Sequence, residues 1–289
     1  MINATDENGS RMSWAGRNDP IFEIASGKDT TYPNGDKLPP IWVTEPVVDD
    51  NGDVVGRTYA MPYPYFDHKF PFPGHDDEQG EDALYYGACY YNEGMNFTDS
   101  ADREKRIDCF RAAEVFYRHA AGRGNAIAYL NLGYVYSYDR CEGRYWRDSQ
   151  TLNTAEDYKR PYPREERAFE CFKTAAEADI CEACYKLGDM YKRGVGCEHN
   201  AREAFRWYMR ASEVVGHEAP VILGSVALRL GECYEEGIGT PVSFDRALAW
   251  YRKAVDCLSA AVEAGEVWYA KALTSARAGA KRCEQEMTP

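Results

Sequence analysis

The chain has 289 residues and a net charge of −13, and the charge is uneven, since residues 1–82 contain 16 Asp and Glu against 6 Lys and Arg. Negative charge of this size argues against nucleic acid or an anionic membrane surface as a partner. The amino terminus, MINATDENGSRM, is polar and acidic, and no apolar run reaches the length of a membrane span. We therefore expect a cytoplasmic protein.

Residues 1–82 carry no helical repeat pattern and are punctuated by proline. Two β-prone runs, Ile41–Val48 and Val54–Met61, flank an Asn51-Gly52 turn signal, which predicts a β-hairpin. A proline-spaced string of tyrosine and phenylalanine follows, and each such ring buries on the order of 150–250 Å² when it packs. We therefore expect residues 1–82 to be an acidic, proline- and aromatic-rich extension that docks on a repeat domain, residues 83–289.

A pattern of 36 residues recurs through the rest of the chain, and its clearest copy runs from Ala168 to Ala204. Apolar residues recur at helical spacing on two short segments of each copy, which predicts a helix hairpin. A glycine followed three residues later by tyrosine marks the first helix, at Gly87, Gly133, Gly188 and Gly231. An alanine ahead of an aromatic slot marks the second helix, at Ala113, Ala168, Ala204 and Ala247. Four hairpins result, with insertions of 10, 19 and 7 residues expected as loops.

A glycine inside a helix costs about 1 kcal/mol relative to alanine, so its recurrence needs a physical reason. Without a side chain at Gly188, the second helix can approach closely through a small residue such as Ala204. Tyr191 and either Phe205 or Tyr208 are expected to fill the space beside this contact.

A final helix is expected over Val267–Glu286. It aligns with the first helix of a unit, but Thr274 stands in the place of the glycine and Arg277 in that of the tyrosine. No partner helix follows that would require a close-packing residue. The helix is therefore expected to be the terminal cap that a solenoid needs on its exposed end.

The third and fourth units, Ala183–Ala211 and Ala227–Ala254, resemble the Sel-like repeat (SLR) family, a relative of the tetratricopeptide repeats. Units of that family read roughly A-x-x-L-G-x-x-Y-x-x-G-x-G and then A-x-x-W/Y-Y-x-x-A-A. The first two units match in part, because Gly94 is displaced by one position and Asp139–Gly143 stands where Gly-x-Gly would be. The resemblance covers about residues 83–286. It implies an all-α, right-handed α/α superhelix that serves as an interaction scaffold, without naming a partner.

In such a superhelix the first helices line the concave surface, and the positions two before and one after the glycine point away from the packed stripe. These positions hold Tyr85, Ala88, Asn131, Tyr134, Lys186, Asp189, Arg229 and Glu232, with Tyr91 and Tyr138 beside them. They indicate a groove that is aromatic at its amino end and of mixed charge toward its carboxyl end. A peptide or protein segment suits this groove, with tyrosines as anchors. Ordinary solvated helix surface is the alternative.

The 19-residue insertion, between Tyr138 and Pro163, is a second candidate for binding. Long loops inside compact repeats are often functional, and Tyr145 and Trp146 give this one aromatic anchors. A variable surface loop is the alternative.

The chain has ten cysteines, a number that fits a disulfide framework in a secreted protein. One branch of the Sel-like repeat family is secreted, cysteine-rich and credited with penicillin binding or β-lactamase activity, and it places a cysteine pair at constant separation in each repeat. Here Cys89 and Cys233 instead follow the repeat glycine by two positions, and Cys171 takes the aromatic slot of the second helix. We therefore expect reduced thiols that act as small hydrophobic side chains in the core.

Cys181, Cys184, Cys197 and His199 have the ligand types and rough spacing of a zinc site. The repeat frame places Cys184 on a packed helix and Cys197 in a turn, so no metal or cofactor is expected. The sequence also lacks Ser-x-x-Lys, Gly-x-Ser-x-Gly and a His/Asp pair at catalytic spacing. We expect a monomeric, non-catalytic scaffold or adaptor for a protein or peptide partner. The alternative is an enzyme of the penicillin-recognising kind.

Overall fold

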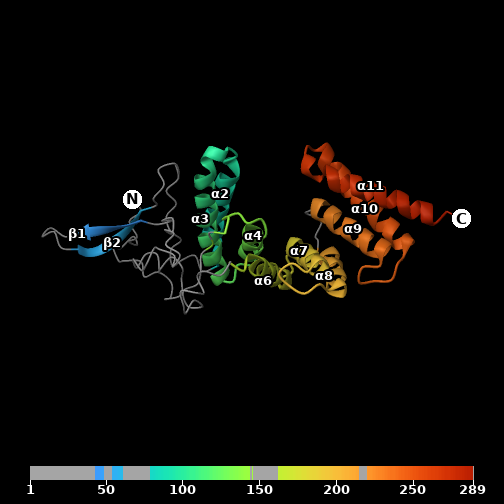
Figure 1. Cartoon of the computed structure of the whole chain (residues 1–289), viewed down its shortest axis with the longest axis horizontal. Helices are drawn as coiled ribbons and strands as arrows, with labels where there is room; N and C mark the ends of the chain where they lie inside the picture. The colour runs from blue at the N-terminus through green and yellow to red at the C-terminus, as the bar shows by residue number, and fades with distance from the viewer. Residues whose placement is uncertain are drawn as a thin grey trace. The chain divides into compact units, whose positions relative to one another are not determined.

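The computed structural model describes the backbone of residues 43–48 and 54–60, and residues 79–143, 145, 162–214 and 220–288. Apart from two strands, the regular structure within these ranges is helical (Figure 1). The chain divides into two compact units between Arg164 and Glu165.

The two strands lie ahead of the helices in the chain. β1, Val43–Val48, pairs antiparallel with β2, Val54–Ala60. The Asn51-Gly52 turn and the aromatic string at residues 61–78 lie outside the described residues. Docking of the extension on the repeats therefore stays a prediction.

The described helices of the first unit are α2 (Glu81–Asn96), η1 (Ser100–Asp102), α3 (Arg103–Gly122) and α4 (Ala126–Ser137). α2 and α3 lie side by side as a hairpin, and α4 packs against α3 (Figure 1). Asn125 begins α4, because its side chain accepts hydrogen bonds from the backbone N–H groups of Ile127 and Ala128.

The described helices of the second unit are α6 (Arg164–Glu177), α7 (Cys181–Arg193), α8 (Ala201–Val214), α9 (Pro220–Glu236), α10 (Phe244–Glu263), η2 (Val267–Tyr269) and α11 (Ala270–Glu286). α7 pairs with α8 and α9 pairs with α10, and α11 packs against α10. First helices and second helices alternate along the chain in the order that the 36-residue frame predicts. The predicted all-α repeat fold is confirmed.

In the first, third and fourth repeats a tyrosine ring lies on the repeat glycine, and the third repeat shows this most clearly. A Cβ placed on Gly188 would lie 2.5 Å from the ring of Tyr208 and 3.1 Å from the backbone oxygen of Ala204. No side chain fits in that space. The sequence left the choice between Phe205 and Tyr208 open, and the structure decides it, because the Phe205 ring stands edge-on to Tyr234 with centroids 5.4 Å apart.

The same contact recurs in the first and fourth repeats. A Cβ on Gly87 would lie 2.6 Å from the ring of Tyr117, and one on Gly231 would lie 2.6 Å from the ring of Tyr251. Both tyrosines are at most 2% exposed. Burying a large side chain contributes about 1.5–3 kcal/mol, which exceeds the cost of about 1 kcal/mol for the helical glycine.

The terminal helix packs more closely than the sequence indicated. Gly279 of α11 lies against the ring of Tyr251, which therefore contacts glycines from two helices, Gly231 and Gly279. The expectation that this helix needs no close-packing residue is wrong. It was based on aligning Thr274 with the repeat glycine, whereas α11 meets the second helix α10 in a different register.

Two of the three insertions extend helices where loops were expected. In the first repeat, the inserted residues lengthen α2 and α3, with η1 between them. In the fourth repeat, α9 begins at Pro220, whose fixed φ suits the first position of a helix. The residues that begin α3, Arg103–Arg106, are strong helix formers, which explains why that insertion does not form a loop.

We predict that Gly188→Leu destabilises the protein by about 1–3 kcal/mol or more, because the ring of Tyr208 must move to admit the side chain. Gly122→Leu is the matched control, since a Cβ on Gly122 meets nothing within 4 Å. Thermal unfolding monitored by circular dichroism measures both variants. A Gly188→Leu protein that melts at the wild-type temperature would contradict the contact.

Candidate functional site

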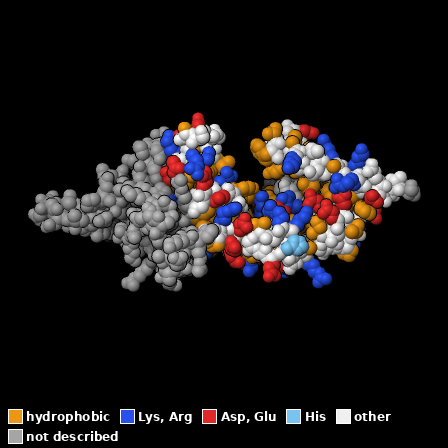
Figure 2. All heavy atoms as spheres, in the orientation of Figure 1, with side chains coloured by type: hydrophobic (Ala, Val, Ile, Leu, Met, Phe, Trp, Pro, Cys, Tyr) orange, Lys and Arg blue, Asp and Glu red, His pale blue; other side chains and the backbone are white. Residues whose placement is uncertain are grey.

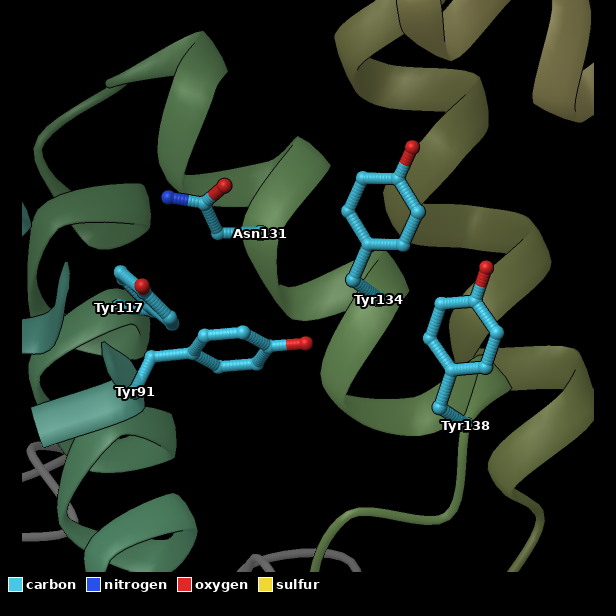
Figure 3. A pocket seen from close by; sticks show the side chains of 5 residues that line it. All are labelled: Tyr91, Tyr117, Asn131, Tyr134 and Tyr138. Atoms are coloured by element: carbon cyan, nitrogen blue, oxygen red, sulfur yellow. The ribbon is translucent and has the colours of Figure 1, made fainter. Parts of the chain in front are cut away.

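A pocket of about 270 Å³ lies within the first unit. Its lining, which we call the tyrosine pocket, consists of Tyr91, Tyr117, Asn131, Tyr134 and Tyr138 (Figure 3). Tyr91 comes from α2 and Tyr117 from α3, while the other three come from α4 and the residue that ends it. Four of these five residues belong to the surface predicted from the sequence.

The rings of Tyr134 and Tyr138 form one wall of the tyrosine pocket. They stack with centroids 5.8 Å apart and planes 3° from parallel, as expected of residues four apart at a helix end. Figure 3 shows the ring of Tyr91 extending toward this wall with its hydroxyl foremost. Tyr138 is 54% exposed, so this wall is reachable from solvent.

Arg140 packs on two rings of the pocket. Its guanidinium carbon lies 5.5 Å from the centroid of the Tyr91 ring and 5.0 Å from that of Tyr138, and it also covers the ring of Phe110 at 5.3 Å. The Nε atom donates a hydrogen bond of 3.1 Å to the Tyr91 hydroxyl. A cation over an aromatic face gains on the order of 0.5–2 kcal/mol. These contacts hold the guanidinium in one place at the edge of the pocket.

The turn that carries Arg140 has an unusual backbone. Asp139 and Glu142 have φ values of 47° and 49°, in the left-handed region. The third and fourth repeats place Gly194 and Gly237 at the position of Asp139, and both have positive φ. A residue with a side chain in this conformation costs about 1–2 kcal/mol. Asp139 offsets part of this cost by accepting a 2.7 Å hydrogen bond from the Tyr145 hydroxyl.

In the second unit, three of the four predicted charged residues form ion pairs within the protein. Arg229 donates two hydrogen bonds of 2.6 Å to the carboxylate of Asp189. Lys192 forms an ion pair of 2.8 Å with Glu232. Figure 2 shows basic and acidic side chains next to one another over α7 and α9. Two ion pairs therefore join the first helices of successive repeats, and the charges predicted to set a partner's register are engaged within the protein.

The carboxylate of Asp189 also accepts a hydrogen bond of 2.8 Å from the Tyr208 hydroxyl. Burial alone would raise the pKa of Asp189, but hydrogen bonds from Arg229 and Tyr208 outweigh it and hold the pKa below its ordinary value. The guanidinium of Arg229 further lies 4.7 Å from the centroid of the Tyr185 ring. The remaining predicted residue of this group, Lys186, lies over the same ring at 5.2 Å.

The fourth repeat has an equivalent arrangement. The hydroxyl of Tyr251 donates a 2.5 Å hydrogen bond to Glu235, and Arg282 donates two more to the same carboxylate at 2.6 and 2.8 Å. In both later repeats, the tyrosine that lies on the glycine has its hydroxyl bound by a carboxylate of the first helix.

The first repeat lacks that carboxylate. Tyr117 is the equivalent tyrosine, but the positions that carry the acidic residue in later repeats hold Ala88 and Tyr91. Among the described residues, none accepts a hydrogen bond from the Tyr117 hydroxyl, and the side chain lines the pocket. Burial raises the pKa of Tyr117, so the hydroxyl stays a donor at neutral pH.

Two predicted aromatic residues lie elsewhere. Tyr85 is 61% exposed and its ring meets that of Tyr86 edge-on, outside the pocket lining. Tyr145 is fully buried, with its ring stacked on that of Tyr162 at 4.8 Å. Tyr145 is therefore a core residue in this structure and not a surface anchor of the insertion. Trp146 lies outside the described residues.

The cysteines are free thiols, and five of the ten are buried. Cys181 donates a hydrogen bond to the carbonyl oxygen of Ala211 at 3.2 Å, and Cys184 donates one to that of Ala176 at 3.6 Å. Within the described ranges, no group of three or more His, Cys, Asp or Glu side chains could hold a metal ion. None of the described helices combines the length and the apolar composition that crossing a bilayer requires.

Sequence reasoning missed Tyr117 and Arg140. Tyr117 was interpreted only as a helix-packing residue, and Arg140 only as part of a degenerate turn. A comparison of the repeats with one another would have revealed both. Arg140 stands where the later repeats place Val195 and Ile238, and Tyr117 faces Ala88 and Tyr91 where the later repeats have a carboxylate.

Comparison with known proteins supports the repeat frame. The family model described as Sel1 repeat matches residues 162–180, 181–213 and 225–257. These ranges contain all of α6, the α7–α8 hairpin except its last residue and most of the α9–α10 hairpin. The resemblance to Sel-like repeats is thereby confirmed. No curated protein matches the chain.

Solved structures that are similar to the chain include the following two. One is a Sel1 repeat protein from Oxalobacter formigenes, 23% identical, with a TM-score of 0.35, and the match covers 48% of this chain and 87% of that one. The other is c5321, a protective antigen of uropathogenic Escherichia coli strains that displays an SLR fold, 17% identical with a TM-score of 0.32. That match covers 73% of this chain and 54% of the antigen, so the chain spans about half of its length.

We predict that Asp189→Asn costs about 2 kcal/mol at pH 7, because it leaves Arg229 partly buried without its partner. The folded-state pKa of Asp189 is depressed, so its contribution is complete above the unfolded-state value of about 3.9 and is lost as pH falls through the folded value. Urea unfolding at pH 7 and pH 3 should show a smaller difference from wild type at pH 3.

Asp179→Asn is the matched control for this substitution. Asp179 forms an ion pair with Arg210 in which both side chains are about half exposed, and such pairs contribute about 0–1 kcal/mol. A loss for Asp189→Asn no larger than that of the control would show that the buried pair does not stabilise the repeats.

We also predict that Tyr208→Phe costs about 1.5 kcal/mol, because it removes a hydrogen bond to a charged group, whereas Tyr117→Phe leaves stability unchanged. Both substitutions remove only a hydroxyl from an equivalent ring. Equal losses for the two variants in chemical denaturation would mean that Tyr117 has an acceptor within the protein.

Proposed function

We propose that this chain, which carries three Sel1 repeats, is a non-catalytic interaction scaffold that binds a peptide or protein segment through the tyrosine pocket. Sel1 repeat proteins generally mediate protein–protein interactions. On this proposal, the predicted residues Tyr91, Asn131, Tyr134 and Tyr138 contact the partner. The ion-paired residues of the second unit keep successive first helices in register.

The observation that supports the proposal is the partly exposed cluster of rigid aromatic rings. Tyrosine supplies a large contact area at low entropic cost, and tyrosine and arginine are enriched among residues that dominate binding energy. Sites for drug-sized ligands usually measure about 300–1,000 Å³. At about 270 Å³ the tyrosine pocket is smaller and suits one side chain of a longer segment.

The state of the thiols supports a non-catalytic role. Burial raises the pKa of Cys109, Cys184 and Cys233 to about 12 in each case, so these thiols are protonated at neutral pH and are poor nucleophiles. Free thiols also suit a reducing compartment such as the cytoplasm.

The pocket can be tested by affinity capture from the native host with quantitative mass spectrometry. Tyr134→Ala and Tyr138→Ala should each lower recovery of specific partners by about tenfold or more, because they remove anchor rings. Val242→Ala is the control, since Val242 is a hydrophobic residue of the second unit with the same 54% exposure as Tyr138. An unchanged set of captured proteins for all three variants, with melting temperatures preserved, would contradict the proposal.

A further inference from the structure

The tyrosine pocket differs in sequence from the equivalent positions of the later repeats in two ways. Each difference leaves a hydrogen-bond donor without an acceptor among the described residues. We propose that the pocket binds an acidic, apolar segment of a partner protein. One apolar side chain occupies the space between the rings, and carboxylates beside it accept hydrogen bonds from the Tyr117 hydroxyl and the Arg140 guanidinium. This inference rests on the proposed function of the pocket.

The first departure is the missing carboxylate at Tyr117. In the third repeat the hydroxyl of Tyr208 is bound by Asp189, and the fourth repeat has the same pairing. The first repeat keeps the tyrosine on its glycine, yet Ala88 stands at the position of Asp189 and Tyr91 at that of Glu235. The side chain of Tyr117 is 2% exposed and lines the pocket, where its hydroxyl has no acceptor among the described residues. A ligand carboxylate would complete the pair that the later repeats form internally.

The second departure is the arginine in the turn after α4. The third and fourth repeats place Val195 and Ile238 at the position of Arg140. The Nε atom of Arg140 is bound to Tyr91, whereas no residue in the described ranges accepts a hydrogen bond from its two Nη atoms. A planar guanidinium binds a carboxylate through two parallel hydrogen bonds. Arg140 therefore offers a free carboxylate-binding edge beside the pocket.

The position of Arg140 is fixed before any ligand binds. Its guanidinium packs on three rings, and its backbone N–H donates a 3.0 Å hydrogen bond to the carbonyl oxygen of Val135. The left-handed backbone of Asp139 and Glu142 shapes the turn around it. Strained backbone persists where the surrounding structure holds it, and it clusters at functional sites. A side chain already held in place loses little conformational entropy when it binds.

Arg140 also decides against a cationic ligand. Four tyrosine rings could otherwise form an aromatic cage for a lysine, arginine or quaternary ammonium group. Here the faces of Tyr91 and Tyr138 already have a guanidinium at 5.5 and 5.0 Å, so a second cation would meet like charge. An anionic ligand meets a positive group and a hydroxyl donor instead.

The test uses a phage library of random 12-residue peptides selected on the full-length protein, followed by fluorescence anisotropy of the selected peptides. We expect the selected peptides to carry Asp or Glu next to a large apolar residue. Changing those carboxylates to amides should weaken binding by about tenfold or more, as should Arg140→Met and Tyr117→Phe. When a peptide carboxylate and its protein partner are both changed, the loss of binding free energy should be smaller than the sum of the two single losses. Arg202→Met, an exposed arginine of the second unit, is the control and should bind as wild type.

The outcomes separate this inference from the proposed function. The inference would be overturned by selected peptides whose binding depends on Tyr138 but which carry no acidic residue. It would also be overturned by peptides that bind the Arg140→Met and Tyr117→Phe variants as tightly as they bind the wild-type protein. Either result would leave the proposed function standing. Failure to select any peptide that depends on Tyr138 would overturn both.

The acidic extension of the chain itself is the rival occupant. In a full-length variant with Asp67, Asp76, Asp77 and Glu78 changed to amides, binding of the selected peptides should stay within about threefold of wild type. A gain of about tenfold or more would show that the extension occupies the pocket, and would overturn the assignment to a partner protein.

Discussion

The packing of a tyrosine ring on a helical glycine is the contact on which the hairpins of the first, third and fourth repeats depend. Without a side chain at Gly188, the ring of Tyr208 can bridge two helices, and the burial of the ring outweighs the cost of the glycine. The contact also fixes the tyrosine hydroxyl against the first helix, where it needs an acceptor. In the third repeat Asp189 supplies one and becomes part of an ion pair with Arg229. In the first repeat none is supplied, and a pocket stands in its place.

On the proposed function, the tyrosine hydroxyl serves stability in the later repeats and binding in the first repeat. Where the first helix has a carboxylate, the hydroxyl, the carboxylate and an arginine hydrogen-bond to one another. Where it has Ala88, the hydroxyl of Tyr117 stays unmatched and aromatic residues surround it. The tyrosine keeps its contact with the glycine in all three repeats, so this difference in side chains leaves the packing of the two helices unchanged.

The helix hairpins and four of the five pocket residues could be predicted from the sequence, because helix spacing and the position of the repeat glycine are local properties. They place Tyr134 and Tyr138 on one helix face, and the structure stacks them. Contacts between residues that are far apart in the chain could not be predicted in this way. Arg229 binds Asp189, which is 40 positions away, and Gly279 of the terminal helix contacts Tyr251. A charge pattern alone cannot distinguish side chains that bind each other from side chains that await a partner.

A crystal structure of the full-length protein with a selected acidic peptide tests the central claim most directly. The account predicts a peptide carboxylate within about 2.7–3.2 Å of the Tyr117 hydroxyl or the Arg140 Nη atoms, with an apolar side chain between Tyr91 and Tyr138. It would be contradicted by a peptide bound away from these rings, or by one whose carboxylates face solvent while both donors remain unmatched.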